Sequence, residues 1–152
     1  MNPKRLILGI VLVFAVVWVT DFLIHGLWLQ SRYAATMTLW RSQDDMQKHI
    51  VWLFLGQFVF SVAFVTIWAQ GFATHRQVAC GILYGLFMAL FSQAATFISF
   101  AVQPLPRDIA VKWVLSGLLQ GMLIGVLVYF VYKPKTKESV ASIADASSAQ
   151  PT

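Results

Sequence analysis

Four long apolar runs, separated by short polar stretches, set the pattern of this chain. They cover about residues 6–29, 50–70, 78–102 and 109–132. At ~1.5 Å per residue in a helix, each run is long enough to cross the ~30 Å hydrocarbon core of a bilayer. Backbone polar groups in lipid must be satisfied within their own segment, so the runs predict four transmembrane helices. The expected fold is all-α: an integral membrane antiparallel four-helix bundle.

The polar stretch between the first two runs carries signals for further helical turns. Tyr33, Met37 and Trp40 fall at i, i+4 and i+7, a spacing that predicts a short helix lying in the membrane interface. Ser42 followed by Asp45 matches a capping pattern. The second long helix is therefore expected to start near residue 43 and to enter the membrane near residue 50.

Other polar residues predict how the third and fourth helices begin. Thr74 with Gln77 fits the capping box of a helix over about 78–102, which Pro104 then ends. Asp108 is the expected cap of the fourth helix. After residue 133 the chain is basic and then rich in Ser and Ala. The prediction is one transmembrane domain over 1–133 and a disordered cytoplasmic tail over 134–152.

Composition places the whole chain in the membrane class. Its 152 residues are 59% hydrophobic and only 11% charged. A soluble domain carries about 25% charged residues, so this chain has too little charge to cover a water-facing surface. The net charge of +5 does not indicate a nucleic-acid partner, because the Lys and Arg residues flank the apolar runs, where lipid headgroups attract them. Cys80 is the only cysteine, which excludes an intramolecular disulfide.

The basic residues also predict how the chain lies in the membrane. Four spans place both termini on one side. That side holds Lys4, Arg5, Arg76, Lys133, Lys135 and Lys137, whereas the other holds Arg32, Arg41, Lys48, Arg107 and Lys112. Cytoplasmic segments carry the excess of Lys and Arg, so this narrow difference favours cytoplasmic termini.

Each apolar run contains one strongly polar residue near the centre of the membrane. At ~1.5 Å per residue from each midpoint, Asp21, Gln57 and Gln93 lie roughly 5 Å toward the outer side, and Gln120 lies near the middle. These four predict a polar centre that opens outward, either a pocket for a solute, ion or proton or a set of interhelical hydrogen bonds. Hydrogen bonding is favoured for the glutamines. A functional role is favoured for Asp21, because an acid inside a membrane is costly.

Two Asp–His pairs raise the question of a metal site. Asp21 and His25 are spaced i, i+4 and so share a helix face, and Asp45 and His49 repeat the spacing. Two carboxylates and two imidazoles suit zinc or another divalent ion if they meet. The favoured alternative is local pairing of each aspartate with its own histidine, since no other metal motif accompanies them.

Small residues predict a close helix contact. Gly81 and Gly85 form a GxxxG unit in the third run, and Gly117, Gly121 and Gly125 form two overlapping units in the fourth. Glycines let helix backbones approach closely. The contact is expected either between these two helices or across a dimer.

Two functions follow as expectations. The favoured one is a structural or accessory membrane protein that acts through helix–helix contacts, with the lipid bilayer and a second copy or another membrane protein as partners. The alternative is a small proton- or ion-coupled transporter or solute-binding protein that uses Asp21, with His25 as proton partner. An enzyme is less favoured and no cofactor is expected, because the sequence contains no recognisable nucleophile set, phosphate loop or catalytic carboxylate pair.

A family resemblance adds a location. The segment Asp21-Phe22-Leu23-Ile24-His25-Gly26, together with Val102-Gln103-Pro104-Leu105-Pro106, resembles a group of small bacterial four-span membrane proteins without an established activity. The resemblance covers most of residues 1–133. It implies the bacterial inner membrane and implies no reaction.

Overall fold

The computed structural model describes residues 2–132, and every regular element within them is helical. Four helices are long and apolar enough to span a membrane: α1 (Pro3–Asp21) continued by the π-helix η1 (Phe22–Trp28), α4 (Ile50–Gly71), α5 (Val78–Val102) and α6 (Arg107–Val131). Three short elements connect η1 to α4, namely α2 (Gln30–Ala35), the 3-10 helix η2 (Met37–Leu39) and α3 (Gln43–Lys48). The predicted tail over 134–152 lies outside the described residues.

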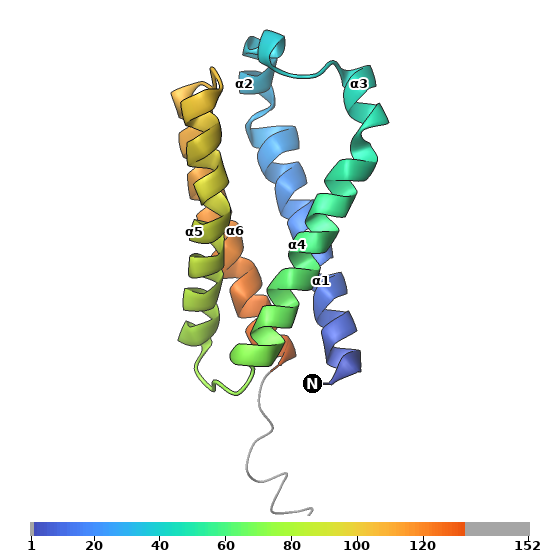
Figure 1. The fold of residues 1–152 in the computed structure, drawn as a ribbon, viewed down its shortest axis with the longest axis vertical. Coiled ribbons are helices and arrows are strands. Elements are labelled where there is room, and N and C mark those ends of the chain that lie inside the picture. Colours follow the sequence, from blue (N-terminus) through green and yellow to red (C-terminus); the bar gives the residue numbers. More distant parts are fainter. Residues whose placement is uncertain (1, 133–152) are drawn as a thin grey trace, which may run out of the picture.

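The long helices form two differently arranged pairs. α5 and α6 run side by side, whereas α1 and α4 cross near their middles and diverge toward one end (Figure 1). That end holds α2, η2, α3 and the connection between α5 and α6, and is called the α2 end below. The opposite end holds the N-terminus and the connection between α4 and α5, and is called the N-terminal end.

The main core lies toward the N-terminal end, where all four long helices meet. Its buried residues are Val13, Val17, Phe64, Val65, Trp68, Tyr84, Ile124, Val128, Tyr129 and Tyr132. The Tyr84 hydroxyl donates a hydrogen bond to the Phe64 carbonyl and so joins α5 to α4. A smaller cluster of Leu105, Ile109 and Ala110 lies at the α2 end, against Tyr33, Trp40 and Trp113. Between the two apolar clusters, the helices contact one another through polar side chains, which are described below.

The predicted glycine contact forms between α5 and α6. Gly81, Gly85, Gly121 and Gly125 are all buried in it. A Cβ added at Gly81 would lie 2.7 Å from the Gly125 carbonyl oxygen, and one added at Gly121 would lie 2.6 Å from that of Gly85. These distances leave no room for a side chain, so the close approach depends on glycine. Of the two sites expected for the contact, the structure forms the one within the chain.

Helix starts agree with the capping signals at some positions and differ at others. Ser42 caps a helix as predicted, because its hydroxyl accepts the Asp45 N–H at 3.3 Å. That helix is not the start of the second long helix, as the sequence predicted, since α3 ends at Lys48 and α4 begins separately at Ile50. The Thr74 prediction is wrong: α5 begins at Val78 after Gln77, which makes no side-chain cap bond. The Asp108 prediction is also wrong, because α6 already begins at Arg107 and Asp108 lies within its first turn.

The interfacial helix predicted from Tyr33, Met37 and Trp40 is wrong in extent. Helix α2 ends at Ala35, and the next residue, Thr36, has φ −126° and ψ 32°. The Thr36 hydroxyl donates to the Arg32 carbonyl at 2.8 Å and accepts from the Trp40 indole at 2.9 Å. These two bonds hold the chain in a bend, so Met37 leaves the shared face and is 72% exposed.

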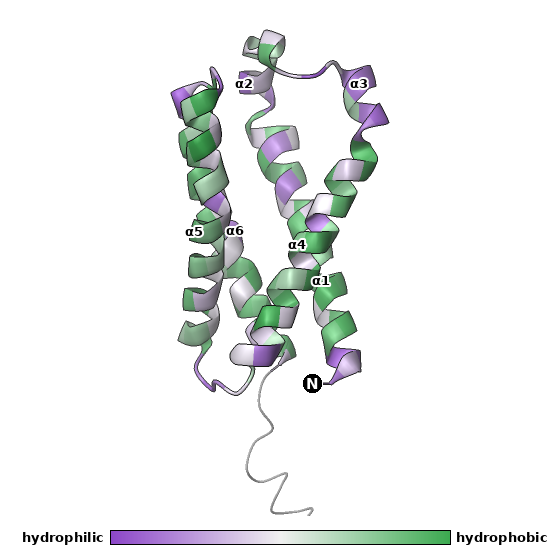
Figure 2. Ribbon diagram, viewed as in Figure 1, coloured by the Kyte–Doolittle hydropathy of each residue, from purple (hydrophilic) through white to green (hydrophobic). Residues whose placement is uncertain are grey.

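The hydropathy of the long helices differs between the half toward α2 and the half toward the N-terminal end. Apolar colour covers most of the four long helices, and hydrophilic colour gathers at their ends (Figure 2). Within the long helices, the strongly hydrophilic positions lie mainly in the half toward α2. This half is where α1 and α4 diverge.

Candidate functional site

Asp21, the last residue of α1, is held by side chains from two other helices. Gln57 of α4 donates its Nε2 to Asp21 Oδ2 at 2.6 Å, and Gln120 of α6 donates its Nε2 to Asp21 Oδ1 at 2.7 Å. Both carboxylate oxygens therefore receive an amide N–H, and the carboxylate is fixed in orientation. Asp21 forms no ion pair with any residue that the structure describes.

Neighbouring hydroxyl and amide groups complete this cluster. Gln120 Nε2 also donates to Thr20 Oγ1 at 2.6 Å, and the Thr20 hydroxyl in turn donates to the Val16 carbonyl at 2.7 Å. Gln57 Oε1 is buried and has no hydrogen-bond partner. A buried acceptor without a donor is uncommon in folded proteins.

A cavity of about 220 Å³ lies beside Asp21. Its walls come from α1 and η1, α5 and α6: Asp21, Ile24, His25, Gln93, Thr96, Trp113, Ser116, Gly117 and Gln120. Gln93 Oε1 accepts the Thr96 hydroxyl at 2.8 Å, and its amide nitrogen lies against Gly117. Gly117 thus gives space to a polar side chain, unlike the other four glycines, which bring two backbones together.

A second polar network lies at the end of the cavity nearest to α2. Trp113 Nε1 donates to the Tyr33 hydroxyl at 2.7 Å, and that hydroxyl lies 2.6 Å from His25 Nδ1. An indole N–H can only donate a hydrogen bond, so the Tyr33 hydroxyl accepts from Trp113 and can donate its own O–H to His25. Burial raises the pKa of Tyr33, as does the Asp21 charge, whereas the Trp113 bond lowers it. Because the net shift is upward, the Tyr33 hydroxyl stays protonated and available as a donor at neutral pH.

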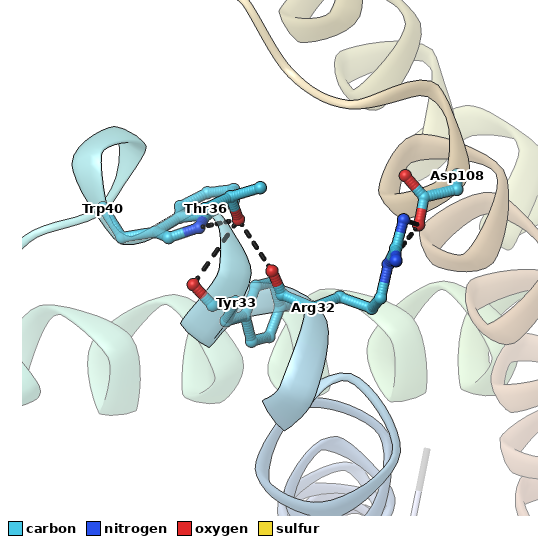
Figure 3. Close-up of polar contacts among 5 residues, drawn as sticks. All are labelled: Arg32, Tyr33, Thr36, Trp40 and Asp108. Atoms are coloured by element: carbon cyan, nitrogen blue, oxygen red, sulfur yellow. Dashed lines mark hydrogen bonds and ion pairs between the residues drawn. The ribbon is translucent and has the colours of Figure 1, made fainter.

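Contacts from α2 hold Tyr33 in this position. Arg32 pairs with Asp108 at the start of α6, with Nε 2.6 Å and Nη2 2.5 Å from the same carboxylate oxygen. Figure 3 shows Arg32 reaching Asp108 and Thr36 bonded to its neighbours on the other side of α2. The pair is partly exposed, so its contribution to stability is small. The pair fixes α2 over the start of α6. Trp113 lies five residues after Asp108 on the same helix.

His25 lies in a stretch of unusual helix. η1 (Phe22–Trp28) follows Asp21 directly, and its last bond joins Leu29 N–H to the Ile24 carbonyl at 2.9 Å, five residues back. π-helical turns are rare and are found mainly at functional sites. The sequence predicted a continuous helix over 6–29, and nothing in the apolar pattern distinguished these residues from the α-helix before them.

The four residues considered for a metal lie in two separate places. His25 and Asp21 line the cavity, whereas Asp45 and His49 belong to α3 and its end, where His49 Nδ1 donates to the Asp45 carbonyl at 2.7 Å. Within residues 2–132, no three His, Cys, Asp or Glu side chains form a group that could hold a metal ion. Of the two local pairings predicted from the sequence, the structure forms that of Asp45 with His49, with 3.5 Å between His49 Nδ1 and Asp45 Oδ1. Asp21 and His25, both among the described residues, form no such ion pair, and His25 Nδ1 lies against the Tyr33 hydroxyl instead.

The candidate polar residues from the sequence do meet in space. Gln57 and Gln120 each donate a hydrogen bond to Asp21, and His25 and Gln93 line the same cavity as Asp21. Sequence analysis missed Thr20, Tyr33, Thr96, Trp113 and Ser116. Ser116 could have been found, because it lies four residues before Gln120 on the same helix face. Comparison of the chain with family models, with curated proteins and with solved structures finds no match.

Proposed function

We propose that the chain is a multi-pass protein of the bacterial inner membrane. In this proposal the four long helices cross the membrane as an antiparallel bundle, both termini are cytoplasmic, and the α2 end faces the outer side. Their length and apolar surface support the insertion. The basic residues of the sequence support the orientation by a narrow difference, with six on the side of the termini and five on the other side: Lys4, Arg5, Arg76, Lys133, Lys135 and Lys137 against Arg32, Arg41, Lys48, Arg107 and Lys112.

Within that frame, the function that the geometry supports best is the binding of a small solute or ion at Asp21, as in a small proton- or ion-coupled transporter. One observation carries the proposal: three helices converge on a carboxylate that has no cationic partner among the described residues and that lines a cavity. An acid at membrane depth is costly, and such residues usually mark a solute, ion or proton path.

The glycine contact weakens the accessory function as the alternative. The contact between α5 and α6 of one chain buries all four glycines, so they offer no surface to a partner helix: Gly81, Gly85, Gly121 and Gly125. The remaining exposed faces of the long helices are general apolar surface, which lipid covers without specificity. The feature that favoured an accessory protein therefore no longer points to a partner.

The glutamines suit a carboxyl group that gains and loses a proton. With Asp21 ionised, Gln57 Nε2 donates to it, as the structure has it. With Asp21 protonated, a half-turn of the same amide would present the unpartnered Gln57 Oε1 to the carboxyl O–H. Gln57 can thus bond either form of the acid. His25, tied to Tyr33 at the outer end of the cavity, is the neighbouring group that can exchange a proton with water.

Water access to the cavity tests this function directly. In a Cys80→Ala background, Ser116→Cys places a thiol in the cavity wall, whereas Leu119→Cys, one turn away and 66% exposed, places it on the lipid side. We expect a membrane-impermeant thiol reagent added outside intact cells to label position 116 and not position 119. A thiol at 116 that reacts from neither side would contradict the proposal.

Stability of Asp21→Asn gives the second test. Asparagine has one oxygen to accept from Gln120 and an NH2 group that can donate to Gln57 Oε1 once the Gln57 amide turns over, so both contacts can form without a charge. We therefore expect the purified variant to unfold at the same or a higher temperature than wild type in detergent. A variant that is clearly less stable at both acid and neutral pH would assign Asp21 to packing instead.

A further inference from the structure

We propose that the solute bound at Asp21 is a small organic monocation, an ammonium compound held between the carboxylate and two aromatic rings. This inference rests on the proposed function and names the class of ligand. The supporting features are the unbalanced charge of Asp21, the aromatic outer wall of the cavity and the size of the cavity.

The charge is the first argument. Two cationic side chains near the α2 end have other partners: Arg32 pairs with Asp108, and Lys112 Nζ lies 5.4 Å from the centre of the Trp28 ring. Asp21 receives only amide N–H groups, which are neutral. A cation that enters the cavity would therefore supply the single positive charge that the site lacks.

The aromatic wall is the second argument. His25 and Trp113 line the cavity together with Asp21, and their ring centres are 6.1 Å apart at an interplanar angle of 70°. Tyr33 bonds both rings and so holds them in place. A cation near the face of a tryptophan is attracted by the ring, and aromatic groups combined with a carboxylate are the usual recognition set for ammonium ligands.

Size and ligand chemistry select an organic cation over a bare metal ion. The cavity of about 220 Å³ is several times the ~30 Å³ share of one water molecule. A hard divalent ion needs six or more oxygen ligands at short range. Here one carboxylate faces amide donors and aromatic rings, and the described residues contain no cluster of metal-binding side chains.

The test compares a charged probe with its neutral copy. Choline and its carbon isostere, in which a quaternary carbon replaces the nitrogen, have the same shape and differ in charge. We expect calorimetric titration of the purified full chain in detergent to give at least about tenfold tighter binding of choline, and Asp21→Asn to abolish that preference.

Two Trp113 variants separate the ring from its N–H group. Trp113→Phe keeps an aromatic face and loses the bond to Tyr33, whereas Trp113→Leu loses both. We expect Trp113→Leu to weaken choline binding about tenfold and Trp113→Phe to weaken it less. Helical circular dichroism and a monodisperse elution profile establish that each variant is folded. If Trp113→Leu does not fold, Tyr33→Phe takes its place, because it removes the Tyr33 hydroxyl and leaves the Trp113 ring intact. A tenfold loss of choline binding in Tyr33→Phe would then assign binding to the hydrogen bonds of Tyr33 and overturn the aromatic role.

Each other outcome is decisive. Equal binding of choline and the isostere, unchanged in Asp21→Asn, would overturn the cation and leave a neutral solute for the same cavity. Binding that needs Asp21 and ignores loss of the Trp113 ring would overturn the organic class. Absence of binding by both probes would overturn the ammonium proposal. The proposed function is then judged by the labelling of Ser116→Cys, which needs no ligand.

Discussion

The α5–α6 pair and the α1–α4 pair differ in what lies between their helices. Between α5 and α6 there is backbone against backbone, with four glycines in the contact. α1 and α4 meet through larger side chains such as Phe14 and Phe54, whose ring centres are 6.4 Å apart. The two helices cross near their middles and diverge toward the α2 end (Figure 1). The α5–α6 pair thus provides one closely packed wall, and the cavity beside Asp21 lies between that wall and α1 with η1.

The largest expected effect comes from breaking the rigid pair. In Gly121→Ala, the new Cβ would lie 2.6 Å from the Gly85 carbonyl oxygen, so the helices must move apart. We expect a loss of about 3 kcal/mol in the free energy of unfolding, the upper part of the range for overpacking. Chemical denaturation in detergent micelles measures it.

Gly56→Ala on α4 is the matched control. No atom lies within 4 Å of a Cβ placed there, so the variant should be as stable as wild type, or more stable by up to ~1 kcal/mol from helix propensity. Equal losses at Gly56 and Gly121 would remove the distinction between the two pairs.

A smaller effect is expected where α4 reaches the polar cluster. Gln57→Leu removes the N–H that Asp21 Oδ2 accepts, which leaves a part-buried carboxylate oxygen without a partner. The cost of such a group is about 1–3 kcal/mol. A double-mutant cycle with Asp21→Leu should recover about 1 kcal/mol or more, because both polar groups are then gone. Strictly additive losses would show that the two residues act independently.

The network at the α2 end should contribute about one hydrogen bond. Tyr33→Phe removes the hydroxyl that joins Trp113 to His25, with an expected loss of about 1 kcal/mol in unfolding free energy. The control is Tyr132→Phe, since the Tyr132 hydroxyl is buried without a hydrogen-bond partner and its removal should cost nothing. The prediction is wrong if both substitutions have the same effect.

The smallest effect is expected in α3, away from both pairs. The hydrogen bond from Arg41 lowers the pKa of Asp45, with the Arg41 and His49 charges acting in the same direction. A lowered pKa in the folded state means that the contribution is complete above the ordinary carboxyl pKa and is lost as pH falls through the folded value. Asp45→Asn should therefore lower the melting temperature barely measurably at neutral pH and not at all in strong acid. A difference that grows in acid would reverse the sign.

The level of each polar residue along its helix was predictable from the sequence, whereas the direction in which its side chain points was not. Counting residues from the middle of each apolar run was enough to place Asp21, Gln57 and Gln120 at levels where they could meet, because helix rise is constant. The same count cannot tell which helix a side chain faces. It therefore gave no sign that Gln57 would bond Asp21 directly while Gln93 would reach only the cavity wall.

Two of the missed residues, Trp113 and Tyr33, share one physical reason. Both are aromatic residues near helix ends, a position typical of residues that contact lipid headgroups at the membrane–water interface. Only the bend at Thr36 and the Arg32–Asp108 pair bring Tyr33 over Trp113. The Arg32–Asp108 pair joins residues 76 positions apart in the sequence, and no local pattern predicts such a contact.

The glycine contact and the Asp21 cluster also differ in the order in which a growing chain can make them. α5 and α6 are joined by the short stretch 103–106 and can close as a hairpin once both are synthesised. The bonds of Asp21 span 36 residues to Gln57 and 99 to Gln120. Asp21 thus leaves the ribosome first and gains its last partner only when about half of α6 has been made. In the proposed membrane location, the Asp21 carboxyl group would be without its Gln120 partner until then.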